Sequence, residues 1–393
     1  MNTIGRILQS IKLLVLFAGI IFLASCMEKQ GADEPLFTTR TVLVYMVANN
    51  DLNSYAQKDI AEMKEGMRQN IPKNCRWLVY YTEKDQKSRL IEIDRNGEET
   101  VLLEYLSTES SVSVSRMKQV IDHVKLFTAP NHLGLVLWSH ATGWLNEENS
   151  MSVGSEAVAL PLSFGYDGEY GKRMKIKSLA EALRGTRFEF IYFDCCHMAT
   201  TEVAYELNLH AGIMVASATE LELDGMPYDK NVVPLLKGDC MTAAQNSFKF
   251  YSDRYAMGWG YGCTISVFNL LEMQQLAGQT YNVLRDNALL PDDYRPVKYF
   301  RSWVVPGGLY DFNHYIKALC GNRQEVYAGW KRAFDNVVVF HKTTPTVFDL
   351  DARDFSGMAT NIVRSADEMT PGNDIYGYRE TAWWKDVVSP AFE

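Results

Sequence analysis

Two cysteines and a histidine stand side by side at residues 195–197, directly after a run of β-forming residues. In the stretch FIYFDCCHM they follow Asp194 and precede Met198. Three interpretations fit these residue types: a thiolate nucleophile, a metal site, or small buried side chains that only pack a core.

A metal site is the weakest of these interpretations. Structural zinc is held by spaced ligands such as two C-x2-C pairs, and no second pair accompanies Cys195 and Cys196. The sequence contains no EF-hand loop, so ligands for calcium cannot be placed. We therefore expect no metal and no other cofactor, with calcium as the one ion left open.

A second reactive side chain, His140, follows another strand pattern. The runs LGLVLWS at 133–139 and FEFIYFD at 188–194 both predict buried strands. In open parallel sheets, functional groups gather at the carboxyl ends of the strands. If these strands are neighbours, His140 and a cysteine meet at one edge, which is the minimum for a thiol nucleophile with an acid–base partner. A helix that begins just after Cys196 would also lower the pKa of a nearby thiol.

The other patterns predict the elements that must position these strands. Strand signals alternate with helical periodicity, and Asn96-Gly97 marks a hairpin within residues 89–105. This alternation predicts an α/β fold with a mostly parallel sheet covered by helices on both faces. The further expected strands are 41–48, 76–83 and 212–218, and the expected helices lie at 113–127, at 178–185 and from about 199.

Two segments depart from the alternation. Residues 141–175 are polar and rich in glycine, which predicts a long loop or insertion. A turn-rich break near 289–296 separates the sheet from a smaller, mixed C-terminal part. We therefore expect a main domain at 38–288 and a C-terminal region at 289–393 packed on it.

The N-terminus predicts an export signal rather than part of the fold. Positive residues precede a short apolar segment, Leu13–Leu23, which is too short to span a bilayer as a permanent helix. The run LASC resembles the bacterial lipobox, which implies removal of residues 1–25, a lipid on Cys26 and a polar tether over 26–37. An ordinary secretory peptide cleaved nearby is the alternative. The resulting expectation is an exported bacterial protein attached to a membrane by its lipid.

Composition excludes some classes of partner. The chain has 39 Lys and Arg residues against 48 Asp and Glu residues, a formal net charge of −9. A nucleic-acid surface needs clustered positive charge, so we expect no nucleic-acid partner. The acidic balance is compatible with a pocket that attracts basic substrates. We expect a folded globular monomer.

Several segments, in order along the chain, resemble the clostripain-like cysteine peptidases, which share a caspase-like α/β fold with the caspases and legumains. The resemblance covers nearly the whole chain after the signal segment, and it implies a cysteine endopeptidase that acts on peptides or proteins. The similar segments are TVLVYMVANNDLN (41–53), LVLWSHATGW (135–144), FDCCHMATTEVAYEL (193–207), ASATELELDGMPYD (216–229), CTISVFNLLEMQQLA (263–277) and ETAWW (380–384).

The resemblance assigns roles at the two strand ends. His140 matches the general acid and base. Cys196 matches the nucleophile, because it stands two residues after Asp194 and two before Met198. Since successive side chains at a strand end point to opposite faces, Cys195 and Cys196 are not expected to face the cleft together.

Asp194 resembles the acidic residue of the family's primary specificity pocket. A buried carboxylate there would pair with Arg or Lys just before the scissile bond, which makes peptides with basic residues the expected substrates. The alternative is that Asp194 caps the following turn through backbone amides. His197 is expected to point away from Cys196 and to pack or lie at the surface.

The chain departs from the family pattern at Ala141, where glycine is usual. The resemblance implies that the amides of Ala141 and Cys196 hold the oxyanion. If the turn requires a positive φ, alanine costs about 1 kcal/mol or more and misplaces that amide. This departure favours a second hypothesis, a catalytically silent lipoprotein that binds basic peptides in the same cleft; a tethered structural lipoprotein is a third.

Members of the family often mature by cutting themselves within the long segment that follows the catalytic histidine. Residues 167–178 read as an exposed loop that offers Lys172, Arg173 and Lys175 as cleavage sites within the 141–177 segment. A solvated basic loop with no processing is the alternative.

Overall fold

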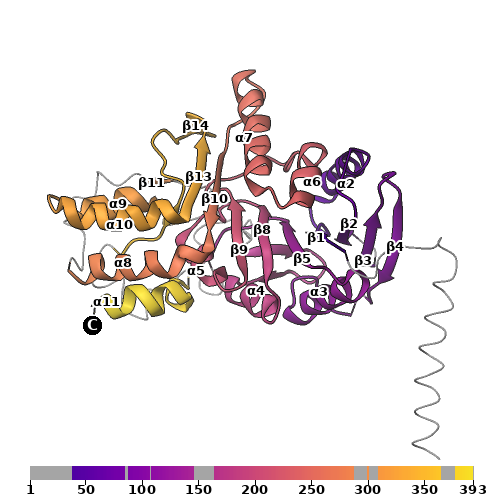
Figure 1. The fold of residues 1–393 in the computed structure, drawn as a ribbon, viewed down its shortest axis with the longest axis horizontal. Helices are drawn as coiled ribbons and strands as arrows, with labels where there is room; N and C mark the ends of the chain where they lie inside the picture. The colour runs from indigo at the N-terminus through magenta and orange to yellow at the C-terminus, as the bar shows by residue number, and fades with distance from the viewer. Residues whose placement is uncertain are drawn as a thin grey trace, which may run out of the picture. The chain divides into compact units, whose positions relative to one another are not determined.

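A sheet of nine strands runs through the described residues (Figure 1). The computed structural model describes residues 38–84, 87–106, 108–145, 163–286, 299–300, 309–363 and 377–392. The strand order is β13-β10-β9-β8-β5-β1-β2-β3-β4. The strands are β1 (Arg40–Val47), β2 (Cys75–Thr82), β3 (Arg89–Ile93), β4 (Glu99–Glu104), β5 (His132–Trp138), β8 (Phe188–Asp194), β9 (Ala211–Ala216), β10 (Thr264–Asn269) and β13 (Val338–Thr343).

The centre of the sheet is parallel and its two edges are antiparallel. Strands β2, β1, β5, β8 and β9 pair in parallel. The hairpin of β3 and β4 extends one edge, and β10 and β13 extend the other. The mostly parallel sheet expected from the sequence is confirmed.

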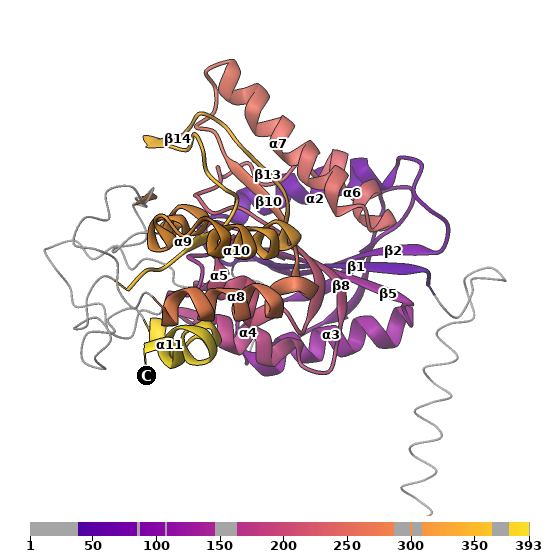
Figure 2. The ribbon, with the colours of Figure 1, turned by 60° about the vertical axis from the view of Figure 1, so that its left-hand side comes forward.

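Helices cover both faces of the sheet (Figure 2). One face carries α2 (Asn53–Met67), α6 (Tyr228–Lys237) and α7 (Cys240–Ala256). The other carries α3 (Val114–Thr128), α4 (Ile176–Leu183), α5 (Thr201–Leu207) and α8 (Met273–Arg285). Every residue of β1 is buried, and its side chains alternate between the two cores, with Val44 on the α2 side and Tyr45 on the α3 side. Burial on both faces explains why this strand is a continuous apolar run.

The C-terminal region contributes to the same sheet. Its strand β13 pairs antiparallel with β10, so residues after 288 complete one edge. The described residues from 38 to 392 belong to one compact unit. The remaining elements are β11 (Tyr299–Phe300), β12 (Leu309–Asp311), α9 (Phe312–Cys320), α10 (Gln324–Val337), β14 (Thr346–Val347), β15 (Leu350–Asp351), β16 (Ala359–Thr360), the short helices η1 (Leu270–Glu272), η4 (Tyr378–Glu380) and η5 (Trp384–Val388), and α11 (Ser389–Phe392).

Residues 164–174, which the sequence predicted as part of a long loop over 141–175, form a hairpin. Strand β6 (Phe164–Asp167) pairs antiparallel with β7 (Lys172–Met174), and Ala141 forms an isolated bridge with Phe164. The strands are short and contain glycine and charged residues, so they give little of the apolar alternation from which strands are predicted. Residues 146–162 lie outside the described part of the chain.

The predicted signal segment, the lipidation site Cys26 and the tether also lie outside the described residues. Among the helices that the structure describes, none is long and apolar enough to cross a membrane.

Candidate active site

His140 and Cys196 leave the sheet from neighbouring strands. Strands β5 and β8 pair in parallel with Trp138 opposite Asp194, and each candidate residue lies two positions beyond this pair. Neighbouring strands are about 4.8 Å apart. The structure therefore brings both residues to the carboxyl ends of two neighbouring central strands, as the strand patterns predicted.

The two cysteines turn to opposite sides of the sheet. Cys195 is buried in the core on the α3 side, and its thiol donates to the carbonyl of Leu137 at 2.9 Å. Cys196 is half-buried, packs against the core on the α2 side, and its sulfur accepts the Leu221 amide at 3.3 Å. Only Cys196 is placed to act as a nucleophile at this edge.

The surroundings of Cys196 favour the neutral thiol. Burial, together with the nearby charges of Glu220 and Asp194, raises the pKa of the Cys196 thiol to about 12. Helix α5 begins only at Thr201. The sequence led us to expect that a helix N-terminus lowers the pKa of this thiol; the net shift is upward, because burial and negative charge dominate. The thiol needs a base to lose its proton.

The imidazole of His140 is held by a residue that the sequence did not single out. Nε2 of His140 lies 2.8 Å from Oδ1 of Asp51, in the turn after β1. The carbonyl of His140 accepts the amide of Gly165 on β6 at 2.9 Å. No pattern in the sequence indicated this contact, because Asp51 and His140 are 89 residues apart in the chain.

For two backbone amides at the strand ends, the described part of the chain offers no acceptor from another residue. In the bridge to Phe164, the hydrogen bonds come from Thr142 and Gly165, so the Ala141 amide is not used. Within the described residues, the amides of Ala141 and Cys196 donate to no other residue. Both amides are therefore available to bind an oxyanion.

The conformational need for glycine falls at Gly143 rather than at residue 141. Gly143 has a φ of 73°, and a Cβ there would lie 2.8 Å from the carbonyl oxygen of His197. Ala141 does not have a positive φ. Ala141 therefore lacks the backbone strain that we considered from the sequence. That strain was the reason for the hypothesis of a catalytically silent protein.

Asp194 is the last residue of β8 and lies at the same carboxyl end of the parallel strands. Its Oδ2 accepts the amide of Met226 at 3.2 Å and the hydroxyl of Tyr228 at 2.9 Å, while its Oδ1 has no partner among the described residues. These donors come from the segment before and at the start of α6, so Asp194 does not cap the turn that follows it. Burial raises the pKa of Asp194 above its usual range.

A second buried carboxylate lies beside Asp194. Oδ2 of Asp59 accepts the indole N–H of Trp138 at 2.6 Å. The Oδ2 atoms of Asp59 and Asp194 lie 2.7 and 3.2 Å from the point that a Cβ on Gly225 would occupy. Burial and the charge of Asp194 raise the pKa of Asp59. Sequence reasoning missed Asp59, because on α2 it reads as one polar residue of an amphipathic helix.

His197 packs rather than faces the edge. It is buried, its Nδ1 lies 3.1 Å from the carbonyl oxygen of Ala218, and its Nε2 lies 3.3 Å from Oε1 of Glu220. Its φ is 59°, an uncommon value for a residue other than glycine. These contacts agree with the packing role expected from the sequence.

Two of the three candidate cleavage residues lie in a strand, and the third lies between that strand and a helix. Lys172 and Arg173 belong to β7, and the guanidinium of Arg173 lies 4.6 Å from the ring centroid of Tyr166 across the hairpin. Lys175 immediately precedes α4, and its Nζ is 3.5 Å from Oε2 of Glu380. Cleavage after Lys172 or Arg173 would interrupt β7.

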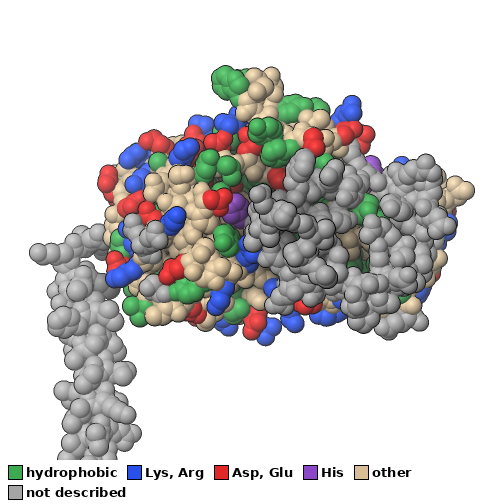
Figure 3. All heavy atoms as spheres, turned by 180° about the vertical axis from the view of Figure 1, so that it is seen from behind, with side chains coloured by type: hydrophobic (Ala, Val, Ile, Leu, Met, Phe, Trp, Pro, Cys, Tyr) green, Lys and Arg blue, Asp and Glu red, His purple; other side chains and the backbone are tan. Residues whose placement is uncertain are grey.

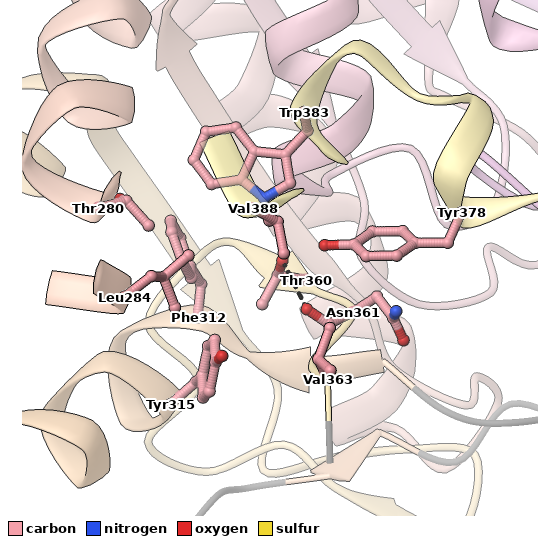
Figure 4. A pocket seen from close by; sticks show the side chains of 10 residues that line it. All are labelled: Thr280, Leu284, Phe312, Tyr315, Thr360, Asn361, Val363, Tyr378, Trp383 and Val388. Atoms are coloured by element: carbon pink, nitrogen blue, oxygen red, sulfur yellow. Dashed lines mark hydrogen bonds between the residues drawn. The ribbon is translucent and has the colours of Figure 1, made fainter. Parts of the chain in front are cut away.

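A pocket elsewhere in the described residues carries no comparable chemistry (Figure 4). The hydroxyl of Thr280 already accepts the indole N–H of Trp330, and the hydroxyl of Thr360 contacts Glu202. Aromatic and aliphatic side chains make up most of the lining. It consists of Thr280, Leu284, Phe312, Tyr315, Thr360, Asn361, Val363, Tyr378, Trp383 and Val388.

Metal and charge patterns add no other site. No group of three or more His, Cys, Asp or Glu side chains in the described part of the chain is arranged to hold a metal ion. On the face seen in Figure 3, acidic and basic side chains are interspersed among the described residues.

Comparisons with known proteins agree with this geometry. The sequence model of the clostripain family matches residues 44–328. An inactive zymogen C11 protease from Parabacteroides distasonis is 27% identical, with a TM-score of 0.75 over 90% of this chain and 99% of that one. A secreted C11 cysteine protease from Bacteroides thetaiotaomicron, solved with an irreversible peptide inhibitor, is 27% identical, with a TM-score of 0.74 over 89% and 99%. No curated protein matches the chain by sequence.

Proposed function

Because this chain belongs to the clostripain family and is a cysteine peptidase, we propose that it cleaves peptide bonds after Arg or Lys, with Cys196 as nucleophile and His140 as acid and base. The observation that carries the proposal is the register of β5 and β8. This register places His140 and Cys196 at the carboxyl ends of neighbouring strands, and the buried Asp194 precedes Cys196 by two residues.

The proposed mechanism follows from the protonated thiol. His140 takes the proton of Cys196 as the sulfur attacks the peptide carbonyl, and the amides of Ala141 and Cys196 bind the oxyanion. His140 then gives the proton to the leaving amine, and water hydrolyses the thioester. Loss of one oxyanion donor typically costs about 10²–10³ in rate.

Specificity for basic residues rests on the free oxygen of Asp194. A guanidinium or ammonium group beside Oδ1 would offset the cost of burying this carboxylate. The similar protein from Bacteroides thetaiotaomicron binds a peptide inhibitor, which supports a peptide as the ligand here.

We extend the proposal to export and processing. The lipobox-like run before Cys26 supports a lipid anchor, and one similar protein is a secreted protease. Lys172, Arg173 and Lys175 are the proposed self-cleavage sites. A denaturing gel tests them, since a Cys196→Ala chain clipped as fast as the wild type excludes self-processing.

The experiment that tests the function uses the full chain in detergent with fluorogenic peptides that end in Arg, Lys, Asp or Ala. The variants are Cys196→Ala and its neighbour control, Cys195→Ala. We expect cleavage after Arg and Lys that is lost in Cys196→Ala and kept in Cys195→Ala. Cleavage that survives Cys196→Ala contradicts the proposed nucleophile, and equal cleavage after Ala contradicts the basic pocket.

A further inference from the structure

We propose that Asp51 is a positioning residue that orients the imidazole of His140 and fixes its tautomer for proton transfer with Cys196. This inference rests on the proposed assignment of His140 and Cys196 as the catalytic pair, and it adds a third residue to that pair. Asp51 acts through His140 and has no contact of its own with the reacting sulfur.

The contact between Asp51 and His140 determines which ring nitrogen carries the proton. Oδ1 of Asp51 lies 2.8 Å from Nε2 of His140, and an ionised carboxylate only accepts hydrogen bonds. Nε2 therefore carries the hydrogen and donates it. In the neutral imidazole the lone pair is then on Nδ1. No described residue is a hydrogen-bond partner of Nδ1, so this nitrogen is left to accept the proton of a thiol.

The protonated state of Cys196 makes this tautomer necessary. Burial, with the charges of Glu220 and Asp194, raises the pKa of the Cys196 thiol to about 12. The thiol therefore keeps its proton near neutral pH and needs an acceptor at the moment of attack. The other tautomer of His140 would present an N–H group where a lone pair is required.

One strand fixes the main chain of both partners. The side chain of Asn50 donates to the carbonyl of Tyr166 on β6 at 2.7 Å, which ties down the turn that carries Asp51. The adjacent residue on β6, Gly165, donates its amide to the carbonyl of His140 at 2.9 Å. Hydrogen bonds to β6 thus hold the main chain on both sides of the contact between Asp51 and His140, although the side chain of Asp51 is exposed.

An ordinary surface ion pair is the competing explanation. The side chain of Asp51 is 73% exposed and that of His140 is 23% exposed, so the contact contributes little to folding. A surface pair with no catalytic role would leave kcat unchanged when it is removed. A positioning role predicts the reverse, a loss of kcat with no change in the melting temperature.

The test uses the full chain with Asp51→Ala, Asp51→Asn and a matched control, Asp122→Asn, which changes an exposed acidic residue on α3. The readouts are kcat and KM for a peptide that ends in Arg, the rate at which iodoacetamide alkylates Cys196, and the melting temperature. We expect Asp51→Ala to lower kcat and the alkylation rate about tenfold, with KM and melting temperature unchanged. Asp51→Asn keeps an acceptor oxygen and should recover part of the loss, and Asp122→Asn should match the wild type.

Wild-type kcat and alkylation in Asp51→Ala would overturn the inference, as would a loss confined to KM or to the melting temperature. The alkylation readout needs no substrate, so it separates this inference from the proposed specificity. If the wild type cleaves no Arg or Lys peptide but Asp51→Ala still slows alkylation, the specificity fails and the positioning role stands. If His140→Ala leaves the alkylation of Cys196 unchanged, the catalytic pair fails and Asp51 loses its role with it.

Discussion

The hydroxyl of Tyr228 should control the pH range in which Asp194 can bind a basic side chain. Tyr228 is fully buried, and its hydroxyl donates to Oδ2 of Asp194 at 2.9 Å. Burial raises the pKa of Asp194, and the hydrogen bonds from Met226 and Tyr228 lower it again. Tyr228→Phe removes one of the two donors and leaves the ring in place, so the pKa of Asp194 should rise.

The size of the effect follows from the contact. A hydrogen bond to a charged group contributes about 1.5–3 kcal/mol, and part of it survives when the acid is protonated. A loss of about 1.4 kcal/mol moves a titration by about one pH unit. In Tyr228→Phe, the acid limb of kcat/KM for an Arg peptide should therefore shift upward by about one pH unit.

The control is Tyr251→Phe, which removes a hydroxyl that donates to the neutral carbonyl of Gly225 at 2.6 Å. Tyr251 is also fully buried, so both variants lose one buried hydrogen bond. The assay measures kcat/KM of the full chain between about pH 5 and 9 for wild type and both variants. An unchanged acid limb in Tyr228→Phe, or an equal shift in Tyr251→Phe, would refute the reasoning.

Three further predictions concern stability. Asp59→Asn should raise the melting temperature more at pH 8 than at pH 5. The pKa of Asp59 is higher in the folded than in the unfolded chain, so the wild type loses stability as the pH rises toward the folded-state pKa. Asparagine cannot ionise and therefore removes this loss. Gly143→Ala should lower the free energy of unfolding, measured with denaturant, by about 1–2 kcal/mol or more, from its φ of 73° and the close His197 carbonyl. Ala141→Gly should not raise kcat/KM and should destabilise by less than about 1 kcal/mol, since Ala141 is unstrained.

The sequence was sufficient to predict the parallel centre of the sheet. A strand such as β1 is buried on both faces, so its residues form an apolar run with no helical periodicity to compete. The carboxyl ends of such strands converge, which is why His140 and Cys196 were predictable as neighbours. The same alternation predicted that Cys195 and Cys196 point apart, and the structure confirms this.

The parts that escaped prediction depend on contacts between distant segments. Asp51 and Asp59 lie in and after the turn that follows β1, and each becomes informative only when β5 brings His140 or Trp138 against it. The β6–β7 hairpin carries too few apolar residues to be read as strands, yet it fixes the main chain of the site. A single sequence reports burial and periodicity, whereas these contacts arise from the register between strands.

The buried carboxylate of Asp194 links the recognition of substrate to the reactivity of the sulfur. Its charge is one of the causes that raise the pKa of the Cys196 thiol, two residues away. A bound Arg or Lys side chain would neutralise that charge and so reduce the cost of forming a thiolate. A peptide with a neutral residue at this position would leave the charge of Asp194 without a counter-ion and the pKa of the thiol raised. In the proposed mechanism, the same ion pair therefore selects the substrate and favours the nucleophile, which makes specificity a property of kcat as well as of KM.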